Sequence, residues 1–213
     1  MPITLQIAPA QAADAQVIAE MSRRLVEVGL PWTWTPARVA RHLYHPDSLV
    51  LAVRANGASN PTLVGFAIMH LGDDIAHLNL LAVDSRWQRR GLGRRLVEWL
   101  EQSAITAGTF SLCLEVRVRN PAALLFYREL GFEETGRVPR YYSGREDALR
   151  LTQDLRHPLA RSWPELETGA WSGAEEKDVA SAPSAAARLA ARFKKQEPQR
   201  QPRGGIQRPA TDA

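Results

Sequence analysis

The chain has 213 residues, 45% of them hydrophobic, and this length suits one domain with a full core plus an additional segment. No apolar run approaches the roughly 18 residues that a membrane-spanning helix needs, and the first 16 residues lack a charged-then-apolar signal pattern, so we expect no membrane partner. The single cysteine, Cys113, cannot form an internal disulfide, which favours a reducing, cytoplasmic location.

Positive charge is concentrated at the C-terminal end. From Arg188 onward the chain has seven basic and two acidic residues, against 20 and 21 before it. Residues 157–213 are rich in alanine, proline, serine and arginine and lose hydrophobic periodicity, so we predict a disordered basic tail behind a domain that spans residues 1–156. All three lysines lie in this tail, which excludes a phosphate-loop lysine and a Schiff-base lysine in the domain.

Hydrophobic periodicity predicts seven strands and four helices, which together form a mixed α/β (α+β) domain. In chain order we expect a strand, two helices, three strands, a helix, a strand, a helix and two strands. Caps and turn residues set the expected bounds. The strands are 3–7, 48–54, 62–71, 75–83, 111–117, 132–140 and 147–155, and the helices are 14–28, 36–44, 92–107 and 121–130.

A polar turn with two glycines joins the fourth strand to the third helix. Its sequence is Gln88-Arg-Arg-Gly91-Leu-Gly93. Glycines allow the backbone to pass close to a ligand, and the N–H groups at a helix N-terminus attract anions. Arginines at positions 89, 90, 94 and 95 add full charges. We favour a phosphate-binding turn over the alternative of a solvated basic helix face.

Three further motifs follow this turn at characteristic intervals. They are Leu-Glu115-Val-Arg, then Asn120, then Phe126-Tyr-x-x-x-Gly131-Phe. With Gln88-x-x-Gly91-x-Gly93, they resemble the GCN5-related N-acetyltransferase (GNAT) superfamily over roughly residues 3–155. Within it the chain is most similar to the ribosomal-protein-alanine N-acetyltransferases, through the same motifs and through Tyr141-Tyr142 followed by residues 144–148.

The resemblance implies the GNAT fold, a mixed and mostly antiparallel seven-stranded sheet flanked by four helices. It implies acetyl-CoA as co-substrate, no metal, and an amine acceptor such as a protein N-terminus. It makes Glu115 the general base and Tyr127 the general acid. The implied coenzyme-binding residues are Leu81, Ala82, Val83, Gln88, Arg89, Arg90, Gly91, Leu92, Gly93, Arg94, Asn120 and Tyr127. We assign Trp32, Tyr141 and Tyr142 to the acceptor side.

The chemistry of amide formation supports these residue types. An ammonium group has no lone pair, so the acceptor must lose a proton before it attacks, and a carboxylate can remove it directly or through water. Backbone N–H groups of a splayed strand can stabilise the oxyanion, and a tyrosine hydroxyl can protonate the departing thiolate.

Other interpretations stay open. Glu115 could be a surface residue paired with Arg117, and Tyr127 could be a core residue on an amphipathic helix. The enzyme could acetylate a small-molecule amine. A different class of function is a non-catalytic acyl-CoA-binding regulator, or a module that contacts the ribosome or RNA through the tail.

Overall fold

The computed structural model describes residues 3–56 and 61–156. The strands are β1 (Thr4–Pro9), β2 (Ser48–Asn56), β3 (Thr62–Leu71), β4 (Ala76–Val83), β5 (Ser111–Arg117), β6 (Glu133–Tyr142) and β7 (Glu146–Asp154). The helices are α1 (Ala15–Leu25), α2 (Pro36–Tyr44), α3 (Leu92–Ala107) and α4 (Pro121–Glu129), with 3₁₀ turns η1 (Ala12–Asp14) and η2 (Ser85–Trp87). The predicted tail and the tip of the β2–β3 hairpin lie outside the described residues.

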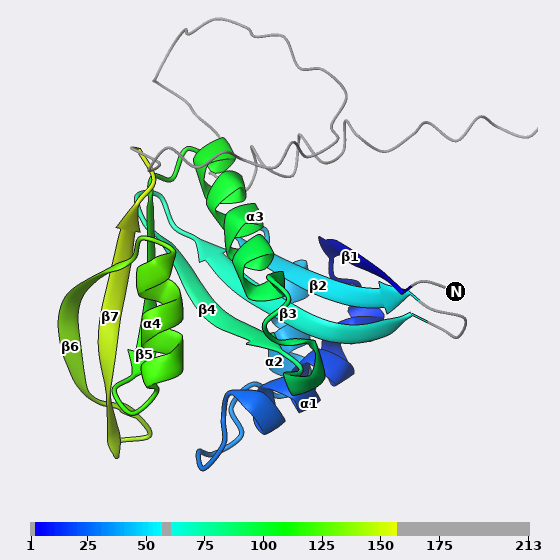
Figure 1. Cartoon of the computed structure of the whole chain (residues 1–213), viewed down its shortest axis with the longest axis horizontal. Coiled ribbons are helices and arrows are strands. Elements are labelled where there is room, and N and C mark those ends of the chain that lie inside the picture. Colours follow the sequence, from blue (N-terminus) through cyan, green and yellow to red (C-terminus); the bar gives the residue numbers. More distant parts are fainter. Residues whose placement is uncertain (1–2, 57–60, 157–213) are drawn as a thin grey trace, which may run out of the picture.

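One seven-stranded sheet organises the domain, in the order β1-β2-β3-β4-β5-β7-β6 (Figure 1). The β4–β5 pair is parallel, and each of the other five neighbouring pairs is antiparallel. Helices α1 and α2 pack on one face, in a core with Phe66 and Ile68 at its centre. Helices α3 and α4 cover the other face, where Leu96, Leu100 and Leu112 are fully buried. The predicted mixed sheet with four flanking helices is confirmed.

A β-bulge in β4 changes which face of the sheet its side chains meet. Leu78 lies opposite Met69 and Leu80 lies opposite Ile68, so Asn79 is an extra residue in β4. Before the bulge, Leu78 packs into the core under α3 and α4; after it, Leu80 packs into the core under α1 and α2. A bulge also bends its strand and increases the local twist. The bend comes at the point where β4 leaves β5.

The first helix is shorter than the sequence pattern predicts. We expected it to run to Val28, but α1 ends at Leu25, and Val28 is 61% exposed. The backbone N–H groups of Val26 and Glu27 both donate to the Ser22 carbonyl, which closes the helix. The chain then turns so that the Glu27 carboxylate reaches backbone N–H groups of the following loop. These tertiary hydrogen bonds of Glu27 end the helix earlier than the spacing of apolar residues predicts.

Candidate active site

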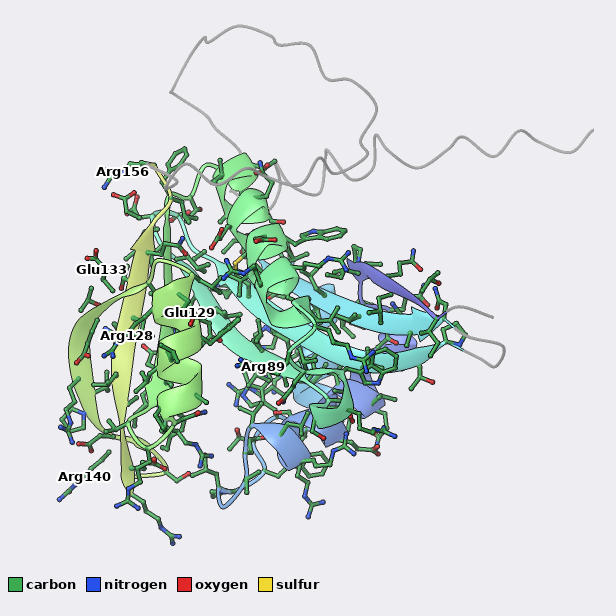
Figure 2. All side chains as sticks on the ribbon, in the orientation of Figure 1. Arg89, Arg128, Glu129, Glu133, Arg140 and Arg156 are labelled. Atoms are coloured by element: carbon green, nitrogen blue, oxygen red, sulfur yellow. The ribbon has the colours of Figure 1, made fainter. Side chains whose placement is uncertain are left out.

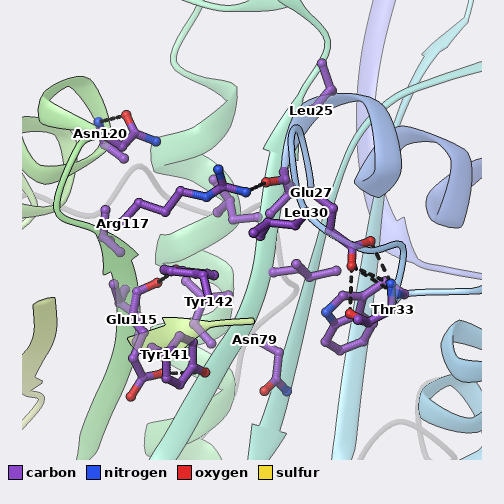
Figure 3. A pocket seen from close by; sticks show the side chains of 18 of the residues that line it. Leu25, Glu27, Leu30, Thr33, Asn79, Glu115, Arg117, Asn120, Tyr141 and Tyr142 are labelled. Atoms are coloured by element: carbon purple, nitrogen blue, oxygen red, sulfur yellow. Dashed lines mark hydrogen bonds between the residues drawn. The ribbon is translucent and has the colours of Figure 1, made fainter. Parts of the chain in front are cut away.

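The central cavity of the domain opens where β4 and β5 separate. Within the described sheet these strands pair only at Ala76–Leu112 and His77–Cys113. Beyond that point a cavity of about 410 Å³ extends between β4, β5, the α1–α2 loop, the start of α4 and the β6–β7 turn (Figure 3). The edge of β4 that faces β5 therefore keeps backbone N–H and C=O groups available to a ligand.

Glu115 on β5 lies at the wall of this cavity, and its carboxylate accepts three hydrogen bonds. Its side chain is only 3% exposed. One carboxylate oxygen accepts hydrogen bonds from His77 Nε2 at 2.6 Å and from the Tyr141 hydroxyl at 3.3 Å. The other accepts from Arg150 Nε at 2.9 Å. The Tyr142 hydroxyl donates to the Glu115 backbone carbonyl at 3.1 Å. The alternative of a surface Glu115 paired with Arg117 finds no support in these contacts.

These contacts set the ionisation of Glu115. Burial opposes the charged form, but the hydrogen bonds and charges of His77 and Arg150 outweigh it and hold the pKa of the carboxyl below its ordinary value. Conversely, the hydrogen bond to Glu115 raises the pKa of His77 against the opposing effect of burial. The charged forms of the two side chains, a carboxylate and an imidazolium, therefore stabilise each other.

His77, Arg150 and Asn79 are site residues that we did not predict from the sequence. His77 and Asn79 lie on β4, two residues apart, and His77 Nδ1 is 2.9 Å from Asn79 Oδ1. Arg150 lies directly opposite Glu115 on β7. The polar-apolar alternation of His77-Leu-Asn79-Leu was visible in the sequence. The strand register that brings His77 beside Glu115 was not visible in the sequence.

A distortion of β6 brings two tyrosines over the cavity. The pairing with β7 shifts between Val138 and Tyr142, and Arg140 has a φ of +54°. The Arg140 N–H donates to Asp147 Oδ1 at 2.8 Å, which holds this turn. Tyr141 and Tyr142 then lie beside Glu115 (Figure 3). Burial raises the pKa of both phenols, so they remain hydrogen-bond donors.

Tyr127 and Asn120 belong to α4 at the other side of the cavity. The Asn120 side chain caps the helix by accepting from the Ala123 N–H at 3.1 Å, and both residues line the cavity. The Tyr127 ring packs edge-on against Phe126 and Phe132. Burial raises the pKa of Tyr127, which keeps its hydroxyl protonated. A protonated hydroxyl at a cavity wall can deliver a proton.

The donor turn, which we define as residues 88–94, follows the C-terminal end of β4. Gly91 has a φ of +76° and starts α3, and Arg89 lies in the turn before it (Figure 2). The arginines at positions 89, 90 and 94 are exposed, while the Leu92 side chain is buried and leaves only its backbone to a ligand. Gln88 donates to the Val83 carbonyl at 2.9 Å and so joins the turn to β4.

Gly93 has a packing role beside its place in the donor turn. A Cβ at this position would lie 3.2 Å from Phe126 Cζ, closer than side chains normally approach. The glycine therefore allows α4, which carries Tyr127, to approach the start of α3. Leu81 lines the cavity, and Ala82 and Val83 continue β4 from it toward the donor turn. The predicted coenzyme residues thus form one path from the turn to the cavity.

The α1–α2 loop forms the opposite wall. Arg117 at the end of β5 reaches across the cavity and donates to the carbonyls of Val26 at 2.9 Å and Val28 at 3.0 Å (Figure 3). Trp34 lines the cavity, whereas Trp32 lies under Arg23 in a neighbouring hollow beside α1. The structure does not bring Trp32 together with the other site residues.

A parted pair of central strands, a cationic glycine turn at the next helix start, and a carboxylate and a tyrosine across the gap are the features expected of an acyltransferase that uses a coenzyme A thioester. No group of three or more metal-ligating side chains occurs within residues 3–56 and 61–156. In the same part of the chain, no helix is both long and apolar enough to cross a membrane.

The chain belongs to the acetyltransferase (GNAT) family, whose sequence model matches residues 19–132. Over 152 residues it is 38% identical to the N-alpha-acetyltransferase RimI of Mycobacterium tuberculosis, an alignment that covers 68% of this chain and 90% of that protein. It is 43% identical over 93 residues to the ribosomal protein bS18-alanine N-acetyltransferase of Escherichia coli, covering 42% of this chain and 63% of that enzyme.

The fold is shared with solved structures of the same family. The crystal structure of the Escherichia coli ribosomal-protein-S18-alanine N-acetyltransferase aligns with a TM-score of 0.60 and 30% identity, over 71% of this chain and 94% of that chain. The predictions of the family, the fold and an acetyl-CoA-dependent N-acetyltransferase are therefore confirmed.

Proposed function

We propose that this enzyme acetylates the N-terminal α-amine of a protein, and that a ribosomal protein beginning with alanine is its acceptor. The observation that carries the proposal is the Glu115 carboxylate, held in a cavity lined by Tyr141, Tyr142 and residues of the α1–α2 loop. Relatives of this chain are named for the same kind of acceptor. A cavity open between two loops can receive the end of an extended chain.

Acetyl-CoA supplies an electrophilic thioester, and the residues present suit its binding. The donor turn offers backbone N–H groups at the start of α3 together with exposed arginines, which suits a pyrophosphate. The unpaired edge of β4 suits an extended arm that ends at a carbonyl. We assign the donor turn, Leu81, Ala82, Val83 and Asn120 to this co-substrate.

The protons of the acceptor have two destinations in this proposal. Glu115 takes one proton from the ammonium, directly or through a water, and so frees the lone pair that forms the new C–N bond. Tyr127 gives a proton to the sulfur as the C–S bond breaks and recovers one as the nitrogen becomes an amide. One proton therefore ends on the thiol and one leaves to solvent.

A set of matched amines tests the acceptor. The full chain would be incubated with acetyl-CoA and an alanine-starting peptide that also contains a lysine, and mass spectrometry would locate the acetyl group. The control is the same peptide with its α-amine blocked, alongside spermidine and an aminoglycoside. We expect acetylation of the α-nitrogen alone. Transfer only to the small amines, or coenzyme binding without any transfer, would overturn the proposal.

The tail is the second part of the proposal. We propose that 1–156 is the catalytic domain and that the excess of basic residues in 157–213 attracts the chain to the ribosome or to RNA. A ribosomal acceptor would also place the enzyme in the cytoplasm. A chain truncated after Arg156 should keep its turnover of peptides and lose salt-sensitive sedimentation with ribosomes. Unchanged sedimentation would contradict this role.

A further inference from the structure

His77 is a half-buried histidine whose two ring nitrogens both meet oxygen atoms. Nε2 is 2.6 Å from the Glu115 carboxylate, and Nδ1 is 2.9 Å from Asn79 Oδ1. Each of these oxygens accepts a hydrogen bond. The two contacts together hold the ring as an imidazolium, which carries a proton on both nitrogens.

Asn79 decides what happens when this imidazolium loses a proton. Because its Oδ1 accepts from Nδ1, the neutral ring keeps the proton on Nδ1 and turns the lone pair of Nε2 toward Glu115. That lone pair then faces a carboxylate oxygen at 2.6 Å with no proton between them. Such an arrangement is electrostatically unfavourable, so the deprotonated pair has a strong affinity for one proton.

Glu115 alone is a poor base in this environment. Arg150 and the imidazolium both stabilise its charge, which lowers the pKa of the carboxyl and weakens its attraction for a proton. An N-terminal ammonium has an ordinary pKa of about 7.7–8.0, so a base close to that range is required for efficient transfer. His77 shifts the basicity of the pair toward that range, because Glu115 raises the pKa of His77.

We propose that His77 is a positioning residue that acts through Glu115, and that the two side chains together receive the acceptor's proton. This inference rests on the proposed function. In the active form Glu115 is a carboxylate and His77 is neutral. The proton moves from the ammonium nitrogen to a Glu115 oxygen and then to Nε2, leaving a free amine, a carboxylate and an imidazolium. Loss of that proton to solvent restores the active form.

Other titratable and charged groups lie on the elements around the His77–Glu115 pair. His70 on β3 and Cys113 on β5 are the register partners of His77. Arg150 on β7 and Tyr141 on β6 contact Glu115. Arg38 on α2 lines the same cavity. Glu115 is the one anion in this set and makes the shortest contact. It therefore dominates the charge state of the ring, and Arg150 acts against it.

NMR of histidine-labelled full-length protein tests the pair without any acceptor. His77→Gln identifies the His77 resonances, and the exposed His45 serves as an internal reference. We expect His77 to titrate above its ordinary value of 6.5, and to titrate at lower pH in Glu115→Gln. A midpoint at or below 6.5, or one that Glu115→Gln leaves unmoved, would overturn the inference.

A pH profile of kcat/KM tests the role in catalysis, using any amine that the enzyme acetylates. We expect the wild-type rate to rise through the NMR midpoint of His77. In His77→Gln that limb should disappear, leaving only the amine's own ionisation, and kcat/KM should fall about tenfold or more. His45→Gln is the control and should match the wild type. An unchanged profile in folded His77→Gln would overturn the inference, whereas failure to acetylate peptides would overturn only the proposed acceptor.

Discussion

Replacing Tyr127 by phenylalanine removes one hydroxyl from the cavity and leaves the ring in place. The ring keeps its edge-on contacts with Phe126 and Phe132, at centroid distances of 5.0 and 5.4 Å. No hydrogen bond to the hydroxyl contributes to its pKa within the described structure. We therefore expect the free energy of unfolding to change by less than about 1 kcal/mol.

The catalytic effect should be much larger than the effect on stability. Burial raises the pKa of the phenol, so it is protonated and ready to donate throughout the working range. General acid catalysis contributes about 10²- to 10⁴-fold, so the single-turnover rate should fall by that factor, or about 2.7–5.5 kcal/mol. The dissociation constant of acetyl-CoA should stay within about threefold of the wild-type value.

Rapid-quench measurement of acetylated peptide, with enzyme in excess, is the appropriate assay because it isolates transfer from product release. Tyr44→Phe is the matched control, since it removes a hydroxyl from an exposed tyrosine that does not line the cavity and should leave the transfer rate unchanged. A Tyr127→Phe enzyme that transfers acetyl within about threefold of the wild-type rate would refute the general-acid role.

Three further predictions concern the donor turn, the loop and the ion pair. Arg89→Gln should raise the KM for acetyl-CoA with little change in kcat, most clearly at low salt, because an exposed charge attracts phosphate without touching the reacting atoms; equal KM values at low salt would contradict this. Arg117→Gln should speed amide hydrogen exchange in residues 26–33, because two hydrogen bonds to carbonyls of that loop are lost. Unchanged exchange would contradict the role of Arg117 in holding the loop. The free energy of unfolding lost in His77→Gln should be greatest at about pH 5–6.5. Because the pKa of His77 is raised in the folded state, its contribution to stability is complete below 6.5 and is lost as the pH rises through the folded-state pKa. Because the pKa of Glu115 is lowered, its contribution to stability is lost as the pH falls through that pKa. Urea unfolding from pH 5 to 9 measures this difference, and a difference that does not vary with pH would contradict the ion pair.

Much of the fold could be predicted from local sequence. The bounds expected for β3 and β5 are those observed, since each has a clear apolar pattern between turn signals. Helix α2 also begins at Pro36 as expected, behind the Thr35 cap. The end of α1 could not be predicted, because Glu27 makes its hydrogen bonds with a loop that follows six residues later.

The site was partly predictable for a similar reason. The resemblance to the family selected Glu115 and Tyr127 as candidates, but not the partners of Glu115. His77 and Arg150 become its neighbours only through the β4–β5 and β5–β7 registers, which are long-range contacts. The adjacent Leu80 and Leu81 do interrupt the alternation in β4, and this was the one local signal of the bulge. The assignment of Trp32 to the acceptor stays a prediction, although Trp34 is the tryptophan that lines the cavity.

The binding of a bisubstrate ligand tests most directly whether the cavity brings a protein α-amine to the thioester. In this ligand an acetyl linker joins the sulfur of coenzyme A to the α-nitrogen of an alanine-starting peptide. If the two sites meet at Glu115, calorimetry should give a dissociation constant at least ~100-fold below that of coenzyme A, because the peptide is held at high effective concentration. The control joins the same peptide through a lysine side chain, and it should lose this gain. A bisubstrate ligand that binds no more tightly than coenzyme A would contradict the account.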